Sequence, residues 1–315
     1  MEDYPRTLAE LERRFATEEA CRDYLAALRW PEGFVCPRCG HERAWPLARG
    51  LWQCAGCDAQ TSVTAGTILA GTRKPLSLWF RAMWHVTSQK NGVSALGLQR
   101  VLGLGSYETA WVWLHKLRRA MVRPGRDRLH GRVEVDETYI GGERAGGQGR
   151  GAYGKTLVLV AAEEDGTHIG RIRLLRIPSL ETETLSAAVS ACVQPGSVVH
   201  TDGLASYAGL SGAGYLHQVT RVKAAPPGEE PLPRVHRVVS LLKRWMLGTH
   251  QGAIRPSHLD YYLDEFTFRF NRRTSHSRGK LFYRLAQQMM AVDPLPQAQL
   301  LGGTSTKLPQ PESTG

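Results

Sequence analysis

Two CxxC pairs constrain the N-terminal part of this 315-residue chain more than any other feature of the sequence. Fourteen residues lie between the pairs, a spacing typical of a zinc ribbon, in which four thiolates surround one Zn²⁺ tetrahedrally. Two copies at this spacing argue against a redox motif, and a closed four-cysteine site leaves no open position for catalysis. We therefore predict a structural zinc ion held by Cys36, Cys39, Cys54 and Cys57.

The formal net charge of +11 is divided unevenly along the chain. Residues 71–130 carry a net charge of +9 and residues 211–290 carry +8, whereas residues 131–210 between them carry −3. Basic segments attract polyanions, nucleic acid first, because they neutralise phosphates and release counterions. An acidic segment between them indicates a site that holds cations. General solubility is the alternative explanation of the charge.

Nothing in the sequence indicates a membrane protein. The apolar run Leu157–Ala162 is far shorter than the ~20 residues that cross a bilayer. Glu2, Asp3 and Glu10 do not fit the basic-then-apolar plan of a signal peptide. We therefore expect a cytosolic protein, in which free thiols persist.

Residues 75–125 carry apolar side chains at the spacing of helices. A turn at Gly103 and Gly105 precedes a basic helix over Ser106–Met121, so the segment has the composition of a helix–turn–helix with a DNA recognition helix. An ordinary helical hairpin is the alternative. The predicted DNA contacts of this helix come from Lys116, Arg118 and Arg119.

From residue 131 the pattern changes to the period of two that is typical of strands. Asp136 lies within one predicted strand, where an acid is costly unless it binds something, and Asp202 ends another. Carboxylates on adjacent strands can hold two metal ions for in-line phosphoryl displacement. His236 opens a helix predicted from about residue 233 to 247, and Lys243 lies two turns further on the same face. Each of these residues alone also has an ordinary structural explanation.

Four segments with motifs follow one another in a fixed order. They are the zinc ribbon, Glu134-Val-Asp136-Glu-Thr-Tyr139, His200-Thr-Asp202-Gly, and the stretch from Leu232 to Arg273 with its His236 and Lys243. With these motifs the chain resembles the insertion-sequence transposases of the ISXO-like group, over about residues 5–290. Proteins of this group pair an N-terminal zinc ribbon with a DDE-type catalytic core.

The resemblance implies an α/β fold with an RNase H-like mixed sheet flanked by helices. It also implies a transposase that cuts and joins the ends of an insertion sequence with Mg²⁺ or Mn²⁺. Asp136 and Asp202 match the first two catalytic acids. His236 occupies the third position, usually Glu, and Glu265 is its rival; the spacing to Lys243 favours His236. Because imidazole suits Mn²⁺ better than Mg²⁺, we expect Mn²⁺ to be tolerated or preferred.

The partners that the resemblance implies are the terminal inverted repeats, target DNA and further copies of the chain, as a homodimer or higher oligomer in a synaptic complex. The resemblance also implies a prokaryotic, nucleoid-associated protein. The ribbon and the helices of residues 75–125 are expected to recognise the repeats. Phosphate contacts are predicted for Lys243, Arg244, Arg272 and Arg273.

We expect four segments: N-terminal helices with the ribbon over 1–70, a helical DNA-binding segment over 71–130, the catalytic domain over 131–290, and a disordered tail over 291–315. Two other functions remain open. A catalytically silent DNA-binding regulator would have no need of the intact acids, and an RNase H-like nuclease would have no need of the ribbon.

Overall fold

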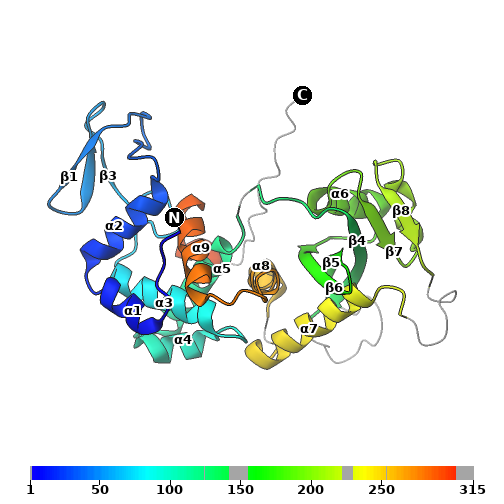
Figure 1. Ribbon diagram of the computed structural model, residues 1–315. Coiled ribbons are helices and arrows are strands. Elements are labelled where there is room, and N and C mark those ends of the chain that lie inside the picture. Colours follow the sequence, from blue (N-terminus) through cyan, green and yellow to red (C-terminus); the bar gives the residue numbers. More distant parts are fainter. Residues whose placement is uncertain (1, 124, 142–154, 222–229, 253, 303–315) are drawn as a thin grey trace. The chain divides into compact units, whose positions relative to one another are not determined.

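The computed structural model describes residues 2–123, 125–141, 155–221, 230–252 and 254–302 (Figure 1). The chain forms two compact units. The first comprises Met1–Pro124 together with Ser275–Thr304, and the second comprises Gly125–Thr274. No described helix is long and apolar enough to cross a membrane.

The first unit consists of helices and a small three-stranded sheet. The strands β1, β2 and β3 form an antiparallel sheet in that order. The elements of this unit are α1 (Leu8–Arg14), α2 (Glu18–Arg29), β1 (Ala44–Leu47), β2 (Leu51–Cys54), β3 (Gln60–Ser62), α3 (Leu76–Ser88), α4 (Ala95–Leu102), α5 (Tyr107–Ala120), α9 (Arg278–Ala291) and α10 (Gln297–Leu301).

Local sequence explains where most of these helices begin. The side-chain oxygens of Thr7, Thr17, Ser94, Ser106 and Ser277 each accept a backbone N–H of the following helix, as N-cap residues do. Helix α3 lacks such a cap because Pro75 precedes it. Its first free N–H groups instead donate to Glu18 of α2, from Leu76 at 2.8 Å and from Ser77 at 3.0 Å.

The core of the first unit shows that two of the expected boundaries are wrong. Phe282 of α9 is fully buried and packs against Phe15, Tyr24 and Phe80 from the N-terminal helices, with ring centroids 5.6–6.2 Å apart. The segment after residue 275 therefore belongs to the first unit and not to the catalytic domain, because its apolar face is buried there. The expected tail over 291–315 contains α10, whose Leu300 is buried; residues 303–315 of that tail lie outside the described part of the chain.

The second unit is built on a five-stranded mixed sheet in the order β6-β5-β4-β7-β8. The first three strands pair antiparallel, whereas β4–β7 and β7–β8 pair parallel. Its elements are β4 (Arg132–Ile140), β5 (Thr156–Asp165), β6 (His168–Arg176), α6 (Thr182–Cys192), β7 (Val198–Thr201), the 3₁₀ helix η1 (Ala205–Leu210), β8 (Leu216–Val219), α7 (Pro233–His250), the 3₁₀ helix η3 (Pro256–His258) and α8 (Leu259–Phe270).

Helices cover both faces of this sheet (Figure 1). On one face, α7 and α8 bury Val158, Val160 and Ala162 of β5. On the other, α6 and η1 pack on Val133 and Val135 of β4. A mixed sheet of this order, flanked by helices and preceded by a zinc ribbon, confirms the predicted RNase H-like fold class.

Candidate active site and zinc site

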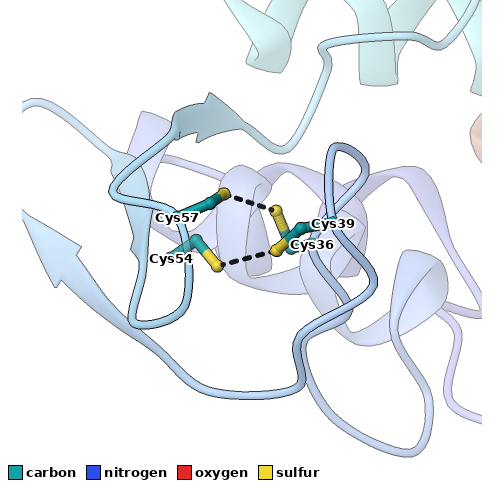
Figure 2. Close-up of side chains that lie close together, drawn as sticks. All are labelled: Cys36, Cys39, Cys54 and Cys57. Carbon is teal, nitrogen blue, oxygen red and sulfur yellow. Dashed lines mark hydrogen bonds between the residues drawn. The ribbon is translucent and has the colours of Figure 1, made fainter.

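The four cysteines of the two CxxC pairs meet at one end of the small sheet (Figure 2). The Sγ atoms of Cys36 and Cys57 are 3.8 Å apart, and those of Cys39 and Cys54 are 3.6 Å apart. Zn–S bonds of about 2.3 Å in a regular tetrahedron place sulfurs about 3.8 Å from each other. The donor set therefore fits Zn²⁺, as the sequence predicted.

The surrounding backbone favours the thiolate form that a metal needs. Hydrogen bonds from the backbone N–H groups of Cys39 and Arg38 lower the pKa of Cys36 to about 6, against the effect of burial. Four thiolates this close together repel one another, so a cation is required to hold them all deprotonated.

The register of the large sheet brings the two predicted catalytic acids together. In the parallel pair β4–β7, Glu134 is the partner of His200. Asp136 and Asp202 each follow two residues later, so alternation places them on the same face at the adjoining ends of the two strands. A cavity of about 440 Å³ opens there, and Asp136 and Asp202 line it.

Asp136 lies in an environment that disfavours its charge. Burial raises the pKa of its carboxyl group, and the nearby Asp202 raises it further, while His236 opposes both. Across from it, Asp202 accepts a hydrogen bond from the backbone N–H of Leu204 at 3.0 Å, which orients its carboxylate. A bound cation would relieve this repulsion between the two carboxylates.

His236 reaches the same cavity from α7. Its Nε2 lies 3.2 Å from Oδ2 of Asp136, and its Nδ1 lies 2.5 Å from Oε1 of Glu230. Histidines that bind metals commonly hold the second ring nitrogen on a carboxylate, which leaves the first free to coordinate. Lys243, two turns further along α7, also lines the cavity.

Glu265, the rival third ligand, lies elsewhere. Its side chain is fully buried in α8 and accepts a hydrogen bond of 2.8 Å from Nε of Arg269. It does not line the cavity that holds the two acids. The structure thus brings His236, and not Glu265, to the cavity that Asp136 and Asp202 line.

Comparison with known proteins identifies two domains in this chain. A family model described as the ISXO2-like transposase domain matches residues 128–271, and a model described as the transposase zinc-ribbon domain matches residues 16–60. The chain belongs to the ISXO2-like transposases. The first match extends from the residues before β4 to the end of α8 and includes all residues of the cavity; the second includes all four cysteines.

A relative of this chain comes from Halobacterium salinarum. It is described as an uncharacterized protein in the transposable element ISH50 and is 26% identical over 283 residues. The aligned part covers 82% of this chain and 92% of that protein.

The basic residues predicted to contact DNA in α5 are only partly available. Arg118 is only 2% exposed, because the apolar faces of α5 are packed into the first unit. This burial argues against a phosphate contact from Arg118. Lys116 and Arg119 are half-buried. Burial lowers the pKa of Lys116. The ISXO2-like chain therefore uses this helix largely as core.

The other predicted DNA contacts differ in exposure. Arg244 is exposed on α7. Arg272 and Arg273 follow α8 and stack on Phe268 and Phe270, each 4.1 Å from the ring centroid. Arg273 also donates to the carbonyl oxygens of Phe270 and Gly170 at 2.9 and 3.3 Å, so it closes the end of α8 as well as carrying charge.

A second group of titratable side chains lies on the same face as Asp136 and was not singled out from the sequence. Ligand atoms of Glu134, Glu164 and His200 lie within 4.8 Å of one another, close enough to be compatible with a divalent cation. Arg234 lies on this group, with Nη1 2.9 Å from Glu134 and 3.8 Å from Glu164. The alternation of acids at residues 134 and 136 is the sequence signal that could have found Glu134.

Proposed function

We propose that this chain is a transposase that cuts the ends of an insertion sequence and joins them to target DNA by metal-dependent phosphoryl transfer. The observation that carries the proposal is the single cavity lined by Asp136, Asp202, His236 and Lys243. Membership of the ISXO2-like family and the relative in a transposable element support it.

Asp136, Asp202 and Nε2 of His236 are the groups that would hold Mg²⁺ or Mn²⁺. A divalent ion in such a site activates water or a 3′-hydroxyl and stabilises charge on the phosphate under attack. The carboxylates supply the negative charge, and Glu230 keeps Nε2 of His236 turned toward Asp136. The ammonium of Lys243 would neutralise the DNA backbone beside the scissile phosphate.

DNA is the proposed partner, and both units contribute to its binding. Arg244 is available for phosphate contacts because it is exposed on α7, the helix that carries His236. The zinc ribbon is proposed to recognise the terminal repeats, together with the helices that follow it. Two copies of the chain or more are proposed to hold the paired ends.

The experiment that tests this function uses the purified full chain, Mg²⁺ or Mn²⁺, and labelled duplexes of the element's ends with a target plasmid. We expect wild type to cleave and join the ends, and Asp136→Asn and Asp202→Asn to bind them without cleavage. Glu183→Gln is a matched control, since this acid is exposed on α6 and does not line the cavity.

Each outcome assigns one function. Strand transfer by wild type that both Asn variants lose supports a transposase. Cleavage without joining supports a nuclease, and binding without cleavage under any metal supports a DNA-binding regulator; either result overturns the proposal.

A further inference from the structure

Helix α7, which carries His236, has no N-terminal cap of its own. Leu232 occupies the N-cap position without a side-chain hydrogen bond, Pro233 follows, and the first turn contains no acidic residue. A helix end of this kind leaves backbone N–H groups without partners unless another element supplies them.

Glu134 supplies the missing cap from the centre of the sheet. Its Oε2 accepts the backbone N–H of Arg234 at 2.8 Å and that of Val235 at 2.9 Å, across a sequence distance of about 100 residues. Its Oε1 accepts Nη1 of Arg234 at 2.9 Å. The Glu134 side chain is 0% exposed, so these donors replace all the water that a carboxylate would otherwise bind.

The position of Glu134 links the two halves of the active site. It lies two residues before Asp136 on the same face of β4, and the second N–H that it accepts belongs to Val235, the neighbour of His236. One side chain thus joins the strand of the first acid to the helical turn of the third ligand. The 3.2 Å approach of His236 Nε2 to Asp136 depends on how that turn is held.

Arg234 completes this anchor and supplies its positive charge. Beyond Glu134, its guanidinium donates to the carbonyl oxygen of Gly166 at 2.6 Å, in the turn between β5 and β6, and to that of His168 at 3.3 Å, at the start of β6. The α7 N-terminus and the guanidinium of Arg234 both contact Glu134, so the negative charge of this carboxylate is already balanced. This favours a fixed anchor over a cation shared by Glu134, Glu164 and His200.

We propose that Glu134 is a positioning residue for metal binding: it fixes the first turn of α7 and thereby sets His236 opposite Asp136. This inference rests on the proposed function, because it assigns His236 the role of third ligand.

The test uses Mn²⁺ alone as the probe, measured by electron paramagnetic resonance on the full chain. We expect Glu134→Gln to weaken Mn²⁺ binding by about tenfold, since partners of metal ligands commonly contribute 10- to 100-fold. Glu164→Gln is the matched control. It removes a charge from the same cluster and no acceptor of the α7 N–H groups, so its affinity should stay within about twofold of wild type.

A double-mutant cycle separates positioning from a general structural effect. In a His236→Ala background, Glu134→Gln should weaken Mn²⁺ binding no further, because its effect passes through His236. Amide exchange of the first turn of α7 in the metal-free protein should become at least about tenfold faster in Glu134→Gln. If that variant does not fold, Arg234→Gln tests the same anchor from its other side.

Equal weakening with and without His236, or wild-type affinity and exchange in Glu134→Gln, overturns the inference. These readouts need no DNA and no turnover. Failure of wild type to cleave and join element ends would instead refute the proposed function, and would leave the exchange result valid as a measure of the α7 anchor.

Discussion

The phenolic hydroxyl of Tyr207 donates a hydrogen bond of 3.0 Å to Oε2 of Glu137. Glu137 directly follows Asp136, and Tyr207 lies in η1, five residues after Asp202. Tyr207 is completely buried, and burial, with the neighbouring Glu137, raises its pKa well above the ordinary value, so the hydroxyl remains a donor. This bond therefore connects the two chain segments that carry Asp136 and Asp202, the proposed catalytic acids.

Removal of the hydroxyl should affect catalysis more than stability. We expect Tyr207→Phe to reduce the cleavage rate by about tenfold while lowering the free energy of unfolding by about 1 kcal/mol. Tyr215→Phe is the matched control, because it removes a buried hydroxyl that donates to the carbonyl of Val193 at 3.1 Å, outside the cavity. Similar rates for the two variants would refute a role of Tyr207 in placing the acids.

Gly203, immediately after Asp202, should tolerate no side chain. Its φ is +88°, and an added Cβ would lie 2.5 Å from Cγ1 of Val219 on β8. We expect Gly203→Ala to abolish cleavage because the backbone at Asp202 must shift. Gly214→Ala carries a similar φ of +86° with nothing within 4 Å, so it should cost about 1–2 kcal/mol in unfolding free energy without loss of activity. Rate assays and denaturant unfolding on both variants provide the comparison.

The expected preference for Mn²⁺ follows from the imidazole side chain at position 236. A neutral imidazole suits Mn²⁺ better than Mg²⁺, whereas a carboxylate suits both. We expect wild type to cleave faster with Mn²⁺, and His236→Glu to gain relative activity with Mg²⁺. The assignment of His236 as a ligand fails if His236→Ala stays active while His236→Glu is inactive with both ions.

Removal of zinc should unfold the ribbon and leave the second unit intact. Of the four cysteines, only Cys39 is exposed, so Cys39→Ser removes one ligand with little disturbance of packing. We expect zinc content, measured by plasma mass spectrometry, to fall from one ion per chain to near zero, with loss of binding to the element's ends. Cys21→Ala should retain the ion, because Cys21 is buried away from the ribbon cysteines in α2.

Local patterns made much of this structure predictable. The cysteine spacing identified the ribbon, and the alternation from Val133 to Asp136 identified β4, because both depend on neighbours in sequence. The order of motifs, through family resemblance, then placed Asp136, Asp202 and His236 in one site. The cavity that these three residues line agrees with that placement.

What the sequence could not reveal are contacts across long separations. Glu18 caps α3, which begins about 60 residues later, and Glu134 caps α7, which begins about 100 residues later. Nothing in the sequence of either helix indicates which residue supplies its cap. Likewise, the buried face of α9 packs in the first unit, far in sequence from the N-terminal helices that it contacts. For α5, the basic composition indicated an exposed DNA-binding helix, yet Arg118 is buried. The charge of a segment alone does not determine which face of its helix packs against the core.

Stability of the second unit should fall at acidic pH through Glu163. Its carboxylate accepts the backbone N–H of His130 and of Arg171, both at 3.0 Å, and Nη2 of Arg171 at 2.6 Å. Burial alone would raise its pKa, but these donors outweigh burial and lower it below the ordinary value of 4.5. A carboxyl group with a lowered folded-state pKa stabilises the fold above its unfolded pKa, and this contribution disappears as pH falls through the folded pKa.

We therefore expect the difference in unfolding free energy between wild type and Glu163→Gln to be constant from pH 7 to about 5 and to shrink below about 4.5. Denaturant unfolding across this range measures it. In an Arg171→Met background the same difference should be smaller at every pH, since the cation that lowers the pKa is gone; a difference that does not change with pH in either background would contradict the prediction.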